Sequence, residues 1–184
     1  MTHKNTLKAD ESCLLVVDIQ AKLLAAMAES EAVLANTSRL LQGSDILGVP
    51  ALFSEQYPAG LGPTHEALAA HIKGAGAVSK LSFSCAGSLD YLARLKALAR
   101  PQAVICGIEA HVCVLQTALD LKAAGAEVFV VADAVSSRTH ANHALALDRM
   151  RDAGCTLVST EMVLFEWLGA AGTEAFKAIS KLVR

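Results

Sequence analysis

Three side chains in this sequence could carry out covalent chemistry together: the carboxylate of Asp18, the amine of Lys80 and the thiol of Cys113. Asp18 directly follows the apolar residues 14–17, where a carboxylate is costly unless it has a partner or a task. Lys80 ends the short run 77–80. Taken singly, Asp18 could equally be a structural cap and Lys80 a solvated lysine, so both gain weight only if the fold places them at one edge.

Cys113 is the strongest candidate because of its position rather than its residue type. The segment 104–114 runs from an apolar strand through a turn into a helix, which places the thiol in the first helical turn. The helix dipole and the free N–H groups there favour a thiolate and can receive a developing oxyanion. We expect the other cysteines to be small core residues; they are Cys13, Cys85, Cys106 and Cys155.

The elements that would position these residues alternate between short β-branched runs and longer helical stretches, a pattern typical of a doubly wound sheet. Strands are predicted at residues 13–19, 51–54, 77–80, 103–108, 127–132 and 156–159. Helices are predicted at residues 31–47, 88–99, 111–124, 139–153, 162–168 and 173–182. Residues 55–75, which contain several Gly and Pro, are the longest segment without predicted structure. In such sheets the ligand crevice lies beyond the carboxyl ends of the strands.

The predicted fold is therefore a three-layer α/β Rossmann-like fold, in which helices flank a six-stranded parallel sheet. The length of 184 residues fits one domain over residues 1–184. Hydrophobic residues make up 53% and charged residues 18%, which excludes a disordered chain. The apolar runs are too short to span a bilayer, so we expect no membrane partner. The net charge of −2 offers no electrostatic case for nucleic acid.

Cellular compartment and assembly are predicted from weaker signals. The first ten residues are polar and lack the apolar region of a secretory signal. Five cysteines are an odd number without framework spacing, which favours a reducing, cytoplasmic environment over one in which thiols pair. The high hydrophobic share indicates buried subunit contacts, and we expect a homo-oligomer.

In order along the chain, three motifs resemble the marks of the isochorismatase-like cysteine hydrolases. These marks are an Asp ending the first strand, a central Lys and a Cys opening a helix, and they match residues 16–20, 79–80 and 107–114. Residues 131–138 resemble the end of that family's fifth strand. The segments Ser54-Glu55-Gln56-Tyr57-Pro58 and Leu164-Phe165-Glu166-Trp167-Leu168 are most similar to the subgroup of isochorismatase domain-containing proteins.

The resemblance implies a catalytic triad of Asp18, Lys80 and Cys113 that cleaves the C–N bond of a small amide through a thioester. It also implies a cis peptide bond at Ile108–Glu109 and an oxyanion hole formed by the backbone N–H groups of Glu109 and Cys113. Isochorismatase proper hydrolyses an enol ether without a cysteine nucleophile, so Cys113 favours amide or related acyl substrates. From their places after strand ends, the expected pocket residues are Gln20, Leu23, Gln56, Tyr57 and Phe83, a set that suits a small, uncharged substrate. His111 is also expected to line the pocket, because it lies close to Cys113.

One departure from the superfamily concerns metal binding. Nicotinamidases bind a metal through an Asp-x-His motif after the second strand, where this chain has Gln56-Tyr57-Pro58. His65 and His71 lie in the same loop without an acidic partner, which makes a poor site, so we expect no metal and no cofactor.

Two other classes of function are weighed against the enzyme. A binding or scaffold protein that keeps the site with little or no turnover stays open as the alternative. Nucleotide binding is less favoured, because the turn after the first strand, Gln20-Ala21-Lys22, has no glycine that would let a pyrophosphate approach.

Overall fold

The computed structural model describes residue 3 and residues 5–184, and its framework is a six-stranded sheet in the order β3-β2-β1-β4-β5-β6. Every neighbouring pair of strands is parallel, which confirms the predicted sheet. The strands are β1 (Ser12–Val17), β2 (Ala51–Gln56), β3 (Val78–Lys80), β4 (Gln102–Ile108), β5 (Glu127–Ser136) and β6 (Thr156–Val158). The strand order reverses between β1 and β4, and ligands of such sheets bind at this switch point.

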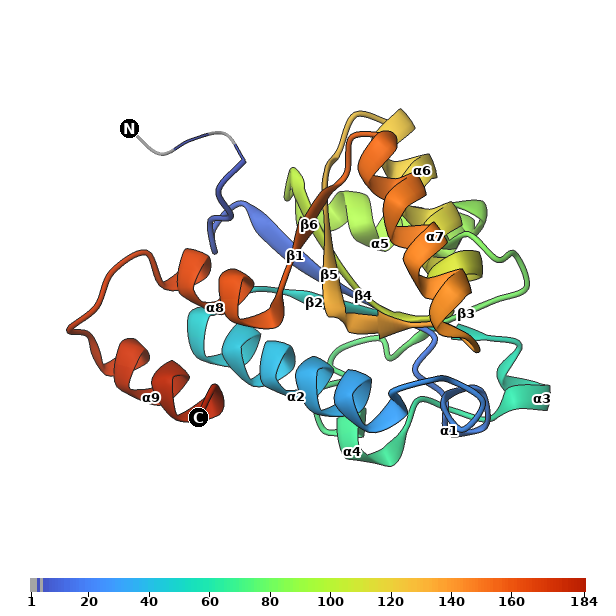
Figure 1. Ribbon diagram of the computed structural model, residues 1–184, viewed down its shortest axis with the longest axis horizontal. Helices are drawn as coiled ribbons and strands as arrows, with labels where there is room; N and C mark the ends of the chain where they lie inside the picture. The colour runs from blue at the N-terminus through green and yellow to red at the C-terminus, as the bar shows by residue number, and fades with distance from the viewer. Residues whose placement is uncertain (1–2, 4) are drawn as a thin grey trace.

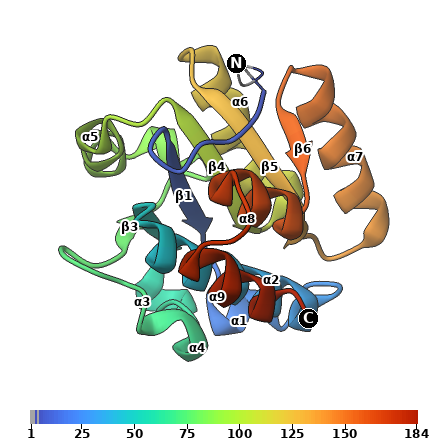
Figure 2. The same cartoon turned by 90° about the vertical axis from the view of Figure 1, so that its left-hand side faces the viewer.

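Helices cover both faces of the sheet, as Figures 1 and 2 show. One face is covered by α2 (Ser30–Leu47), α8 (Thr160–Leu168) and α9 (Glu174–Leu182), and the other by α5 (Leu89–Leu98), α6 (Leu115–Ala123) and α7 (His140–Asp152). Two apolar clusters result, one on each side of the strands. Among the helices of the described residues, none combines the length and apolar character that a membrane crossing requires.

The central strands set the positions of the candidate residues. All six residues of β1 and all seven of β4 are buried, as expected for strands covered on both faces. The register places Val17 beside Ser54 of β2 and beside Gly107 of β4. It also places Gln56 beside Lys80 of β3. The carboxyl ends of β1, β2, β3 and β4 therefore meet at one edge of the sheet.

The expectation that residues 55–75 lack structure is wrong. Strand β2 continues to Gln56, and two short helices follow, α3 (Pro58–Leu61) and α4 (Glu66–Ala69). A further short helix, α1 (Ala21–Leu24), was also not predicted. Each of these helices has only four residues. Hydrophobic periodicity needs a longer window, so a helix of one turn leaves no such pattern.

The predicted helix over residues 111–124 is also wrong in detail. A π-helical turn, Ala110–Val114, precedes α6, and Cys113 lies in this turn rather than in an α-helix. Such turns occur often at functional sites. The prediction of a single domain over residues 1–184 includes residues 1, 2 and 4, which lie outside the described part, and it stays a prediction.

Gly107 allows β4 to approach β1, and its replacement is predicted to destabilise the protein strongly. Gly107 has a φ of 124°, and an added Cβ would lie 2.1 Å from the carbonyl oxygen of Val17. We expect Gly107→Ala to lower the free energy of unfolding by about 4 kcal/mol, because backbone atoms of β1 must move. Gly125→Ala is the matched control, since φ is also positive there but no described atom lies within 4 Å. Its cost should be about 1–2 kcal/mol. If urea denaturation showed that both variants lose the same free energy of unfolding, this explanation would be contradicted.

Candidate active site

The Asp18 carboxylate is buried just beyond the end of β1 and is held by two donors. The Ser54 hydroxyl donates to Oδ1 and the Lys80 ammonium donates to Oδ2, each at 2.7 Å. The Asp18 backbone has a φ of 51°, a left-handed conformation that is uncommon outside glycine. Such conformations cluster at functional sites. Because both oxygens are bonded, the orientation of the carboxylate is fixed.

The Lys80 side chain, at the end of β3, is completely buried. Besides Asp18, its ammonium donates to Oε1 of Gln56 at 2.7 Å and to the carbonyl oxygens of Ser82 and Phe83 at 3.2 and 3.0 Å. An ammonium has three protons to donate, so these acceptors satisfy it. Asp18 balances its charge, and a buried ion pair is tolerated only when its remaining hydrogen bonds are also made.

The Cys113 thiol is buried and lies in the field of both charges. Burial raises the pKa of the Cys113 thiol well above its ordinary value, the Asp18 carboxylate raises it further, and the Lys80 ammonium opposes the rise. The expectation that helix position favours a thiolate is therefore wrong for the resting site. The thiol keeps its proton, and Asp18 is the neighbouring carboxylate that can receive it.

The π-helical turn that contains Cys113 is bonded to the segment after β5. Nε of Arg138 donates to Oε1 of Glu109 at 2.6 Å. Nδ1 of His111 and Oγ of Ser137 are 2.9 Å apart. The peptide bond between Ile108 and Glu109 is cis. Two side chains from each segment therefore hold the start of the π-helical turn.

Sequence reasoning missed a buried polar chain behind Asp18. Ser54 is the centre of this chain, because its Oγ donates to Asp18 and accepts from Sγ of Cys85 at 3.4 Å. The Cys85 N–H donates to Oγ1 of Thr117 at 2.9 Å, and Thr117 lies one helical turn after Cys113. Cys85 is buried, as expected of a core thiol, but it also connects β2 to α6. The sequence carried no local signal for this role of Ser54, because the role follows from the pairing of Ser54 with the last residue of β1.

The residues expected to line the substrate pocket fall into a buried group and an exposed group. Gln20 is fully buried, and its side-chain amide donates to two backbone carbonyls, including that of Gln56. Leu23 is partly buried and packs against the core. Tyr57 and Phe83 are exposed beside the carboxyl end of β3. Of these residues, the two aromatic side chains are therefore the most accessible to a ligand.

The residues around this edge do not supply the ligands of a nicotinamidase metal site. Oε1 of Gln56 accepts from Lys80. His65 accepts a backbone N–H at the start of α4, and Nδ1 of His71 lies 2.7 Å from the Asp45 carboxylate. Within residues 3 and 5–184, no group of three or more His, Cys, Asp or Glu side chains is arranged to hold a metal ion.

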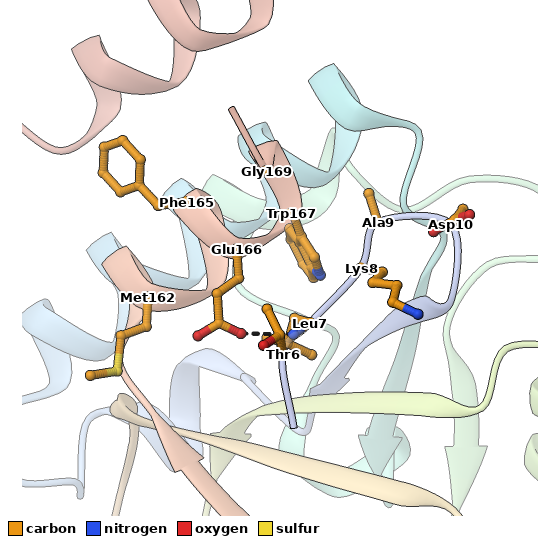
Figure 3. A pocket seen from close by; sticks show the side chains of 10 residues that line it. All are labelled: Thr6, Leu7, Lys8, Ala9, Asp10, Met162, Phe165, Glu166, Trp167 and Gly169. Atoms are coloured by element: carbon orange, nitrogen blue, oxygen red, sulfur yellow. Dashed lines mark hydrogen bonds between the residues drawn. The ribbon is translucent and has the colours of Figure 1, made fainter. Parts of the chain in front are cut away.

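A cavity of about 730 Å³ lies near the start of β1 (Figure 3). Asp18 follows the other end of that strand. It lies between residues 6–10 and α8, and the Leu7 N–H connects these two segments by donating to Oε2 of Glu166 at 2.7 Å. Its lining is Thr6, Leu7, Lys8, Ala9, Asp10, Met162, Phe165, Glu166, Trp167 and Gly169. None of the residues at the carboxyl edge belongs to this lining, so the cavity and the candidate site are separate.

Comparison with known proteins is consistent with this geometry. The isochorismatase domain model matches residues 12–162. Isochorismatase domain-containing protein 2 of Danio rerio is 43% identical over 173 residues, which cover 94% of this chain and 86% of that protein. The structure of the MAR1 ribonuclease from Caenorhabditis elegans is 34% identical with a TM-score of 0.90, covering 97% of this chain and 92% of that one. The YcaC gene product of Escherichia coli, an octameric hydrolase of unknown specificity, is 24% identical with a TM-score of 0.92, covering 99% and 92%. This chain therefore belongs to the isochorismatase family.

Proposed function

We propose that this protein is a cysteine hydrolase that cleaves the C–N bond of a small, uncharged amide without a metal or cofactor. The observation that carries the proposal is the fully buried pair of Lys80 and Asp18, whose charges act on the buried thiol of Cys113. An ion pair with a purely structural role has no need of a neighbouring thiol, and a thiol that only packs in the core has no need of neighbouring charges. The combination of the two therefore favours a catalytic role. Membership of the isochorismatase family supports a hydrolase.

In the proposed acylation step, the proton of the Cys113 thiol moves to Asp18 as Sγ attacks the carbonyl carbon of the amide. The electron pair of the C=O bond moves to oxygen, and the N–H groups of Glu109 and Cys113 receive this oxyanion. When the tetrahedral intermediate collapses, the C–N bond breaks and Asp18 gives its proton to the departing amine. The acyl group is then held on Sγ as a thioester.

In the proposed deacylation step, Asp18 takes a proton from water, which attacks the thioester carbonyl. The C–S bond breaks, the carboxylic acid leaves and Asp18 returns its proton to Sγ of Cys113. Lys80 has two tasks throughout: it orients the carboxylate through its bond to Oδ2, and its charge offsets the negative charge that passes between Asp18 and Sγ. Its charge lowers the pKa of the thiol and thereby favours attack.

The accessible residues near the site favour a small ligand with an apolar part. Tyr57 and Phe83 are more than half exposed and offer aromatic surface. A relative's structure is that of a ribonuclease. The net charge of −2 disfavours RNA as the substrate of this chain, because binding a polyanion depends on clustered positive charge.

Trapping of the acyl group tests the nucleophile. Incubation with a panel of small neutral amides should raise the intact mass by one acyl group, and peptide mapping should locate this group on Cys113. Cys113→Ala should lose both adduct and turnover. Cys155→Ala is the matched control, because Cys155 and Cys113 are each 4% exposed, and it should keep both the adduct and the turnover. Amide turnover that survives in Cys113→Ala would end the proposal.

The pH dependence of alkylation tests the base. A proton that moves from Cys113 to Asp18 stays within the pair, so iodoacetamide should label Cys113 at a nearly constant rate between about pH 6.5 and 8.5. In Asp18→Asn the proton must leave to solvent, so the rate should rise about tenfold per pH unit. Equal slopes in the two proteins would contradict the role of Asp18. Labelling of Cys113 no faster than that of Cys155 would favour the inactive scaffold.

We also propose that the protein forms a homo-oligomer. The octameric state of the Escherichia coli neighbour supports this, as do Leu81 and Leu89, whose side chains are 76% and 86% exposed. The double variant Leu81→Asp/Leu89→Asp should reduce the mass measured by light scattering. Leu145→Asp, at a position that is 61% exposed on α7, should leave it unchanged. A monomeric wild-type protein would refute the oligomer.

A further inference from the structure

The carboxylate of Glu109 is nearly enclosed at the start of the π-helical turn. Its side chain is only 11% exposed, whereas that of its partner Arg138 is 61% exposed. Among the described residues, Arg138 is the only cationic group paired with this carboxylate. A shielded carboxylate is costly without such a partner. If the pair were broken, the Glu109 side chain would turn towards water.

A movement of Glu109 would be transmitted to the turn that contains the nucleophile. The carbonyl oxygen of Glu109 accepts the N–H groups of Val112 and Val114, at 3.0 and 3.2 Å. These two residues flank Cys113 directly. The position of Glu109 therefore sets the position of the backbone on both sides of the thiol.

The segment that holds Glu109 is itself fixed to the framework. Ser137 is fully buried, and its carbonyl oxygen accepts the Ala28 N–H at 2.9 Å. The Ser136 hydroxyl donates to the carbonyl oxygen of Ala28. Ser136 is paired with Ile108 in the sheet, one residue before Glu109. Arg138 therefore extends from a rigid edge, whereas a surface arginine on a free loop would anchor nothing.

We propose that Arg138 is a positioning residue, which holds the side chain of Glu109 and thereby keeps the Glu109 N–H directed at the oxygen of the substrate. This inference rests on the proposed function, because it assigns Arg138 to the oxyanion hole of that reaction. The alternative explanation is that Arg138 and Glu109 form an ordinary surface ion pair, which contributes little to stability. The two explanations differ in which chemical step depends on Arg138.

Two small amides that alkylate thiols separate these explanations. In acrylamide, Sγ of Cys113 bonds to the β-carbon, the C=C electrons shift to give an enolate oxyanion, and the α-carbon then takes the proton that the thiol gave up. In iodoacetamide, Asp18 takes the thiol proton and the S–C bond forms while iodide leaves with the electron pair, so no charge develops on the carbonyl oxygen. Only the acrylamide reaction therefore depends on the oxyanion hole.

We expect Arg138→Ala to slow acrylamide addition at Cys113 about tenfold or more, because a displaced donor no longer meets the oxyanion. Its iodoacetamide rate should stay within about twofold of wild type, since thiol and base are intact. Arg138→Lys should recover only part of the loss, because an ammonium lacks the fixed Nε geometry. Glu109→Gln weakens the same ion pair, so it should also slow acrylamide addition at Cys113.

Arg151→Ala is the matched control. Arg151 is 60% exposed and pairs with Asp148 at 2.7 Å on α7, so its loss removes a similar ion pair from a helix surface. Both reaction rates should be unchanged. Thermal denaturation of all the variants verifies that each is folded.

The outcomes are distinct. If Arg138→Ala slows both reagents equally, the pair only maintains the general structure of the site and the inference fails. If neither rate changes, Glu109 needs no anchor and the inference fails as well. If wild-type Cys113 reacts with neither reagent, or if Asp18→Asn keeps the wild-type pH slope, the proposed function itself fails, and the inference fails with it.

Discussion

The buried ion pair between Lys80 and Asp18 is the interaction on which the rest of the site depends. Removing two charges from water costs more than their attraction returns, unless the surrounding hydrogen bonds are also satisfied. Here Ser54 and Gln56 of β2 supply those bonds, together with two carbonyl oxygens after β3. The pair thus ties together the ends of β1, β2 and β3, and a register slip of one residue would turn every one of these side chains to the wrong face.

The same pair explains how, in the proposed reaction, a thiol with a raised pKa acts as the nucleophile. Burial opposes the loss of the Cys113 proton to water, because a new charge would appear in a poorly solvated place. Transfer of that proton to Asp18 creates no net charge: one negative charge moves from carboxylate to sulfur while Lys80 stays positive. The burial that makes the free thiolate unfavourable therefore opposes the internal transfer far less.

The parts of this structure that were predictable from the sequence are those with a local or periodic signal. The six strands are marked by apolar runs, and Asp18 and Lys80 could be placed because they end such runs. The hydrogen bonds that Ser54 and Gln56 make were not predictable, since they follow from which strands are neighbours and in which register. The π-helical turn was not predictable either, because it depends on tertiary contacts. The resemblance located Cys113 but did not indicate that this residue lies in a π-helical turn.

The site is divided between two halves of the sheet, and this division explains why its alignment depends on backbone packing. Asp18 and Lys80 come from the side of β1 and β3, whereas the turn with Cys113 follows β4 and is held by the end of β5. The two halves meet along the ladder between β1 and β4, where Gly107 lies against Val17. Any side chain at Gly107 would widen that contact and move Asp18 away from the turn that contains Cys113. The absence of a Cβ at this one position therefore allows the two halves of the site to lie close together.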